Sequence, residues 1–168
     1  HLQAGLRHGG VYLITLEPDG AGIKLASYLV RTVQAKLVLA MPPSIPKFED
    51  WDQWLANHPN ETSISHLLHE IRMLQKTGAH ILLAYAAPGV LQETREVLDQ
   101  TLKHFGAIHG VIHTVNLRKE TGSEPGQAVS LPEFQRRVKA KTQELLVLEE
   151  VLREHQPDFC LLLNSLAQ

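Results

Sequence analysis

Five short runs of apolar residues, each of strand length, recur along the chain and constrain its fold more than any other feature. They consist mainly of Val, Ile and Leu and lack the alternation of apolar and polar residues that marks a strand with one solvent-exposed face. Strands buried on both faces have this composition, which is typical of a parallel sheet covered by helices. The runs are VYLIT at 11–15, AKLVLA at 35–40, HILLAYA at 80–86, HGVIHTV at 109–115 and DFCLLLN at 158–164.

Segments with the apolar spacing of amphipathic helices lie between these runs, over 20–33, 63–77, 90–105 and 131–154. In the last of these, the apolar positions at helical spacing are Phe134, Val138, Leu145, Leu148 and Leu152. Strands that alternate with helices predict a doubly wound, Rossmann-like α/β fold. Right-handed crossovers favour the strand order 3-2-1-4-5. The length of 168 residues fits a single domain over 1–168.

Two segments are expected to be loops. Residues 41–62 hold three prolines before Trp51 and Trp54. A short helix is expected around these tryptophans, with a place at the edge of the core. A contact with a partner is the second interpretation of these tryptophans. Residues 116–130 are polar and contain Gly and Pro, so we expect an exposed loop after the fourth strand, at the sheet edge where ligands usually bind.

Charge and hydropathy exclude several classes of protein. The net charge of −2 gives no basic surface for nucleic acid, and no apolar run reaches the ~18 residues of a membrane span. The single cysteine, Cys160, rules out an internal disulfide and fits a reducing, cytoplasmic location. It lies in the apolar run FCLLL, which predicts a buried strand residue.

The ten histidines raise the question of a metal site. His66 and His69 are three residues apart, whereas helical zinc hydrolases need a spacing of four with a glutamate between. His109 and His113 flank a strand and are interpreted as residues of the fold. No metal site is therefore expected.

Four stretches together resemble the ketoreductase domain of modular type I polyketide synthases, a branch of the short-chain dehydrogenase/reductase family. They are GGVYLIT at 9–15, LASYLVRTVQAKLVL at 25–39, FGAIHGVIH at 105–113 and AKTQELLVLEEVLREHQPDFCLLLNSLA at 140–167. The resemblance covers nearly the whole chain. It implies reduction of a β-ketone on an acyl carrier protein with NADPH, and a sheet that continues past the fifth strand, so the domain is expected to be incomplete at its C-terminal end.

The family's phosphate-binding turn follows the first strand and has the form TGGLGGIG, where this chain has TLEPDGAG. Gly20 and Gly22 match the pattern, but Leu16, Glu17 and Asp19 replace glycines. Glycines let the backbone approach the pyrophosphate, and side chains there obstruct it. We therefore expect Leu16 or Glu17 to block the phosphate site.

Three further cofactor contacts of the family are also missing. Met41 and Pro42 stand near the place of the arginine that grips the 2′-phosphate, and Ala87 stands at the place of an aspartate that holds the adenine. Asn116 replaces a glycine near the nicotinamide-side ribose. Losses on four separate loops predict that NADPH is not bound.

Part of the family's catalytic set is present. Lys141 and Ser165 match the catalytic lysine and serine, whereas the tyrosine that donates the proton would follow Gln168. Lys141 is interpreted as a lysine on the helix surface and Ser165 as a strand-end serine, both vestigial.

The sequence thus predicts a non-catalytic, structural pseudo-ketoreductase domain of a polyketide synthase. It would scaffold neighbouring domains such as a C-methyltransferase, an active ketoreductase or a dehydratase. One alternative is an active NADPH-dependent ketoreductase that acts on β-ketoacyl-carrier-protein intermediates. Another is a binding module for a different ligand or for the carrier protein, for which the basic stripe of 131–154 offers a docking surface.

Overall fold

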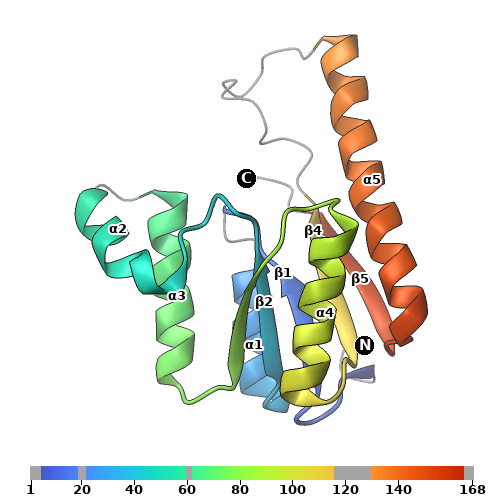
Figure 1. Ribbon diagram of the computed structural model, residues 1–168. Helices are drawn as coiled ribbons and strands as arrows, with labels where there is room; N and C mark the ends of the chain where they lie inside the picture. The colour runs from blue at the N-terminus through green and yellow to red at the C-terminus, as the bar shows by residue number, and fades with distance from the viewer. Residues whose placement is uncertain (1–4, 19–21, 60–61, 116–129, 165–168) are drawn as a thin grey trace.

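The computed structural model describes residues 5–18, 22–59, 62–115 and 130–164. Its centre is a sheet of five parallel strands in the order β3-β2-β1-β4-β5, which confirms the predicted Rossmann-like topology (Figure 1). The strands are β1 (Val11–Thr15), β2 (Lys36–Met41), β3 (Ile81–Tyr85), β4 (Gly110–Val115) and β5 (Phe159–Asn164).

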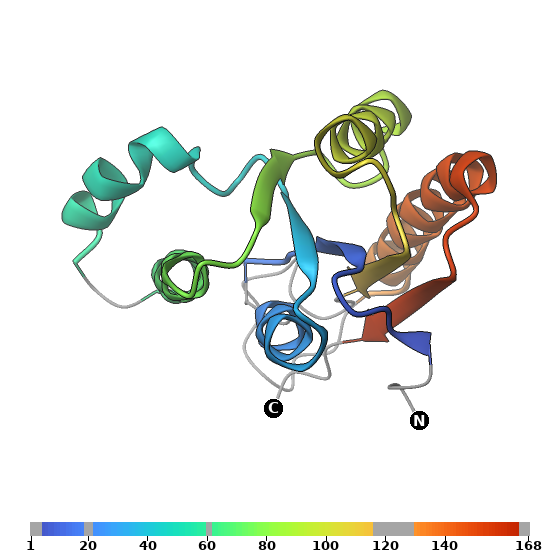
Figure 2. The ribbon, with the colours of Figure 1, turned by 90° about the horizontal axis from the view of Figure 1, so that it is seen from below.

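Helices cover both faces of this sheet (Figure 2). Helices α1 (Ile23–Val33) and α3 (Ser63–Lys76) pack on one face, and α4 (Leu91–Phe105) and α5 (Leu131–His155) pack on the other. Successive side chains along each strand point to opposite faces of the sheet. Tyr12 and Ile14 therefore pack with α1, whereas Leu13 packs toward α4 and α5. The four helical segments predicted from apolar spacing are therefore present.

The proline-rich connection after β2 forms a 3-10 turn at Phe48–Asp50 and then the short helix α2 (Trp51–Asn57). Trp51 is completely buried, and its indole nitrogen donates a hydrogen bond to the carbonyl oxygen of Pro46 at 2.8 Å. Trp54 is partly buried against the same core. Both tryptophans thus pack at the edge of the core, as predicted. The predicted loop at 116–130 lies outside the described residues apart from Ser130.

A glycine at the start of β4 brings three strands close together. Gly110 pairs with Tyr12 on one side and with Phe159 on the other, and the two aromatic rings stack with their centroids 5.8 Å apart. A Cβ atom at Gly110 would lie 2.5 Å from the Phe159 ring and 2.8 Å from the Tyr12 ring. The absence of a side chain at this position therefore makes the β1-β4-β5 packing possible.

Cys160 is exposed, so the prediction of a buried strand residue is wrong. Cys160 pairs with Val111 on β4 and lines a groove with Leu152 and Arg153 of α5. Helix α5 packs against α4, and β5 is the edge strand of the sheet that the described residues form. Partial burial still raises the pKa of the thiol.

None of the helices in the described part of the chain is long and apolar enough to span a membrane.

Candidate functional site

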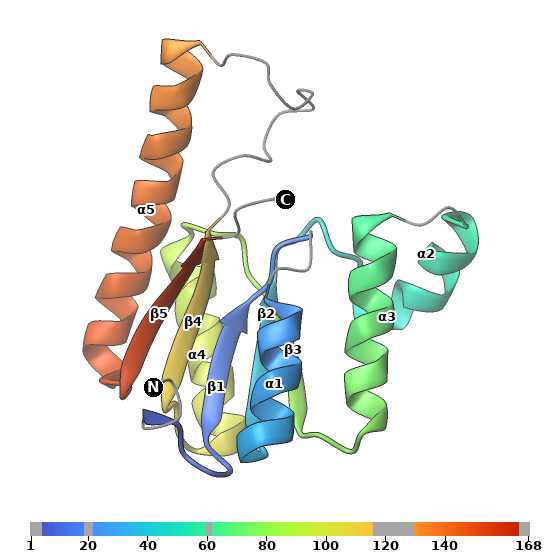
Figure 3. The ribbon, with the colours of Figure 1, turned by 180° about the vertical axis from the view of Figure 1, so that it is seen from behind.

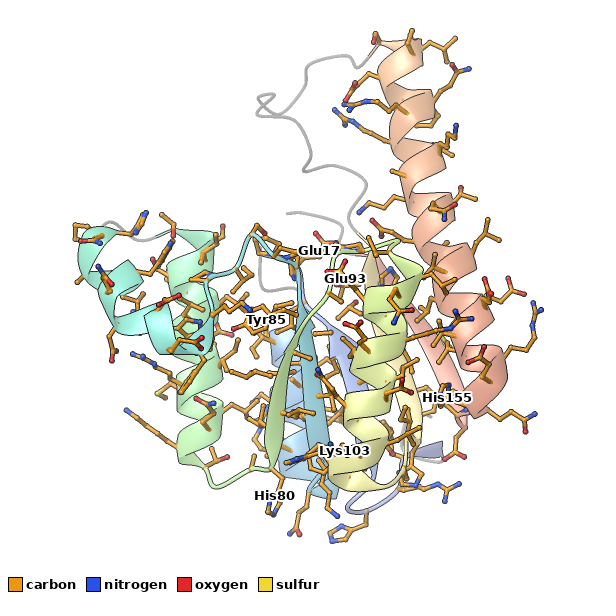
Figure 4. All side chains as sticks on the ribbon, in the orientation of Figure 1. Glu17, His80, Tyr85, Glu93, Lys103 and His155 are labelled. Carbon is orange, nitrogen blue, oxygen red and sulfur yellow. The ribbon has the colours of Figure 1, made fainter. Side chains whose placement is uncertain are left out.

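A crevice of about 730 Å³ lies at the carboxyl ends of β1 to β4. In a doubly wound sheet, ligands bind at this edge because the loops after the strands diverge there. Most of its lining is apolar, and a group of ionisable side chains from the segment after β1, from β4 and from α5 lies within it. Figure 4 shows Glu17 at this end of the sheet, whereas His80 and Lys103 lie at the opposite end.

Leu16 is at the inner border of the crevice and belongs to the core. Its backbone N–H donates to the Ala40 carbonyl oxygen at 2.7 Å, which extends the β1–β2 ladder by one residue. The side chain is only 3% exposed. A Cβ atom built on Gly22, directly before α1, would lie 2.8 Å from Leu16 Cδ2. The leucine side chain therefore occupies the space that the glycine leaves open.

Lys141 lies in the crevice and is only 8% exposed, so its interpretation as a helix-surface lysine is wrong. Its Nζ is 3.2 Å from Glu144 Oε1 on the next turn of α5 and 3.9 Å from Glu17 Oε1 after β1. The face of α5 that carries these residues also carries Leu148 and Val151, which pack on the sheet. Lys141 is buried because the sheet-facing side of α5 continues through it.

His113 on β4 completes this group. Its Nε2 lies 3.5 Å from Glu144 Oε2, and its Nδ1 is 2.9 Å from the Thr15 hydroxyl oxygen. The Thr15 hydroxyl oxygen also accepts the backbone N–H of Thr114 at 2.9 Å. His113 thus links Thr15 at the end of β1 to Glu144 on α5.

Glu144 is the shared partner of this group. Burial works to raise the pKa of the Glu144 carboxyl, but its contacts with His113 and Lys141 outweigh burial and leave that pKa below its ordinary value. Glu144 is therefore ionised in the neutral pH range and is held between the imidazole of His113 and the ammonium of Lys141.

The remaining predicted positions divide into three groups. Pro42 and Ala87 line the crevice, as the resemblance implies. Met41 instead points into the core on the α1 side and is completely buried. The positions that lie outside the described residues are Asp19, Gly20, Asn116 and Ser165.

Comparison with known protein families gives one decisive match. The model of the KR domain matches residues 10–168, which is nearly the whole chain. The chain belongs to the KR domain family. KR domains of polyketide synthases and the short-chain dehydrogenase/reductases share the fold described above.

Curated relatives of this KR domain are polyketide synthases. It is 26% identical over 162 residues to 6-methylsalicylic acid synthase of Penicillium expansum and 26% identical over 166 residues to polyketide synthase ThaG of Burkholderia thailandensis. These alignments cover 95% and 98% of this chain but only 8% and 3% of the two synthases. The chain thus spans a small part of the relatives it matches.

Solved structures share the fold of this KR domain. A ketoreductase domain from the bacillaene assembly line superposes with a TM-score of 0.63 at 20% identity, over 93% of this chain and 33% of that one. A 3-ketoacyl-(acyl-carrier-protein) reductase from Brucella melitensis, solved with NADH, gives 0.58 at 20% identity, over 94% and 56% of the two chains.

Two crevice residues of this KR domain were missed from sequence. Glu144 has a signal, because it lies three residues after Lys141 and thus on the same face of the helix. His113 was correctly placed on a strand, but nothing in its sequence context indicates that its ring reaches the crevice.

Among the described residues, no three His, Cys, Asp or Glu side chains are grouped so as to hold a metal ion.

Proposed function

We propose that this KR domain is a non-catalytic, structural part of a polyketide synthase and does not bind NADPH. The observation that carries the proposal is the position of Leu16. Leu16 stands where the resemblance implies a glycine of the phosphate-binding turn, and its side chain lines the crevice. It packs beneath Gly22, the last glycine of the turn, with Cδ2 2.8 Å from the place of a Cβ there. We infer that a leucine side chain at this position hinders the close backbone approach that a glycine-rich turn offers to phosphate.

The charges in the crevice support the same conclusion. Among the described residues, Glu17 and Glu144 each place a carboxylate oxygen within 4 Å of Lys141 Nζ. A pyrophosphate would bring further negative charge against these carboxylates, and such like-charge contacts cost several kcal/mol. The residues present do not fit a dinucleotide phosphate.

At the adenosine end of the crevice, two positions that the resemblance assigns to NADPH contacts carry other residues as well. Pro42 and Ala87 line it and offer neither a cation for the 2′-phosphate nor a carboxylate for the adenine. The retained fold then serves to hold neighbouring synthase domains, such as a C-methyltransferase, an active ketoreductase or a dehydratase.

Calorimetric titration with NADPH tests this proposal. We expect no binding up to millimolar cofactor, with a catalytically active ketoreductase domain as the positive control. A variant that restores two glycines, Leu16→Gly/Glu17→Gly, is the matched comparison and is expected to bind more NADPH than the natural chain. Micromolar binding by the natural chain contradicts the proposal.

An active NADPH-dependent ketoreductase is the second candidate function, and the position of Lys141 favours it. The resemblance implies a catalytic lysine at this place, and Lys141 does lie in the crevice. This candidate predicts NADPH oxidation in the presence of a β-ketoacyl thioester, and loss of that activity in Lys141→Met. The structural proposal predicts no such oxidation by either protein.

A further inference from the structure

We propose that the first turns of α5 form a docking surface for an acidic, amphipathic helix of a partner protein. The inference rests on the proposed function, because it names the surface by which a structural domain would hold a neighbour. Residues 131–140 are called the projecting turns of α5 below. Two features carry the inference, namely a row of exposed apolar side chains on these turns and the sign of the charges beside that row.

The projecting turns extend beyond the end of the sheet (Figures 1 and 3). They carry Leu131, Phe134 and Val138, and all three side chains are exposed. Single exposed apolar side chains are normal on a protein surface, whereas a group of large ones marks an interaction site. Three such side chains on adjacent turns of one helix therefore indicate a surface that a partner covers.

The spacing of the three side chains suits a second helix. Leu131, Phe134 and Val138 follow one another after three and four residues, which are the a, d and a positions of a heptad. The row they form lies to one side of the helix face that carries Leu148 and Val151, which pack on the sheet. A partner helix can thus lie along the row without displacing α5 from its own domain.

The charges beside the row favour an acidic partner. The exposed ionisable side chains of the projecting turns are Arg136 and Lys139, both of which are basic. The carboxylate of Glu133 is partly buried and is engaged by Arg136 at 2.7 Å and by Arg137 at 3.2 Å. Lys139 forms no ion pair among the described residues.

Opposite charges across an interface steer association and select the partner. The carboxylates of an acidic helix would meet the positive charges of Lys139 and Arg136. A basic helix would meet these same two cations, and the carboxylate of Glu133 is already engaged. The apolar row therefore provides the contact area, and the basic side chains beside it determine the sign of the partner's charge.

Two labelled 18-residue peptides test the charge of the partner. The first is a helix of leucine, alanine and glutamate, with leucines at the a and d positions and glutamates beside them. In the second, lysine replaces every glutamate. We expect the glutamate peptide to bind with a Kd below about 100 µM and at least tenfold more tightly than the lysine peptide, measured by fluorescence anisotropy. Equal affinities, or no binding of the glutamate peptide at 1 mM, overturn the inference.

A variant of the apolar row locates the binding site. Phe134→Ser/Val138→Ser changes two exposed side chains, so the fold is expected to persist and binding of the glutamate peptide to weaken at least fivefold. Met73→Ser, at an exposed apolar position on α3, is the matched control and is expected to bind as the natural chain does. Unchanged affinity in the double variant overturns the inference.

A charge-reversed variant tests the basic side chains. Arg136→Glu/Lys139→Glu is expected to bind the lysine peptide more tightly than the glutamate peptide. Lys103→Glu, at an exposed position on α4, is the control and keeps the preference of the natural chain. An unchanged preference in the charge-reversed variant overturns the inference.

Sedimentation velocity and an NADPH titration separate the remaining outcomes. A dimer of the natural chain that dissociates in Phe134→Ser/Val138→Ser assigns the row to a second copy of the chain and overturns the acidic partner. NADPH binding contradicts the proposed function whatever the peptides do. If neither NADPH nor the glutamate peptide binds, the structural function stands and only the docking inference fails.

Discussion

At the scale of single residues, the most unusual feature is an ion pair that is almost removed from water. Lys141 and Glu144 are 8% and 9% exposed, and their charged atoms are 3.2 Å apart. Burial of such a pair contributes little net stability, but removal of one partner leaves a buried charge without its counter-ion. The two residues are therefore expected to tolerate joint replacement better than single replacement.

A double-mutant cycle measures this coupling. We expect Glu144→Leu to lower the free energy of unfolding by about 3 kcal/mol, because it takes away the nearest counter-ion of Lys141. Lys141→Met/Glu144→Leu removes both charges and is expected to return to within about 1 kcal/mol of the natural chain. Urea unfolding provides the values, and strictly additive losses in the double variant would contradict the coupling.

The ionisation of Glu144 makes stability depend on pH in a defined direction. Its folded-state pKa lies below the ordinary 4.5, so the ionised carboxylate contributes stability above about pH 4.5 and loses it as the pH falls through the folded-state pKa. The difference in unfolding free energy between the natural chain and Glu144→Gln is expected to shrink as the pH falls below about 4.5. A difference in unfolding free energy that grows as the pH falls would contradict the predicted direction of the Glu144 pKa shift.

At the scale of elements, sequence patterns predicted the helices, the strands and the strand order. Apolar spacing and the handedness of crossovers are local or generic properties, so they need no knowledge of contacts. In the first half of α5, the spacing of apolar residues did not identify the buried face of the helix. Phe134 and Val138 are 57% and 42% exposed there, whereas Arg137 and Lys141 are buried. There the helix faces a crevice with polar groups, and an apolar stripe no longer marks the inner face.

The contact of β1, β4 and β5 depends on Gly110. Even Ala at this position would bring Cβ to 2.5 Å from the Phe159 ring, which forces the rings or the strands apart. We expect Gly110→Ala to lower the free energy of unfolding by about 2 kcal/mol, measured by chemical unfolding. Gly110→Ala/Phe159→Leu provides the comparison, because a smaller side chain at 159 relieves the crowding. A double variant that loses the sum of the two single effects would contradict the steric explanation.

At the scale of the whole molecule, α5 and the sheet differ in length. The 25 residues of α5 span roughly 37 Å, whereas the six residues of β5 span about 20 Å. The first turns of α5 therefore extend beyond the sheet (Figures 1 and 3). The later turns carry Val147, Leu148 and Val151, which are buried.

This overhang divides one continuous helix into two units of different local stability. From Glu133 to Val138 the helix has no buried apolar side chain, and Arg137 is its one buried residue there. The backbone amides of this stretch are therefore expected to exchange with solvent at least tenfold faster than those of Leu145 to Val151. Hydrogen exchange followed by NMR measures both sets in one experiment, and uniform protection along α5 would contradict the division. The later turns then open only when the sheet opens, while the earlier turns fray and refold on their own. Hydrogen exchange in this single helix therefore measures local opening at one end and global unfolding at the other.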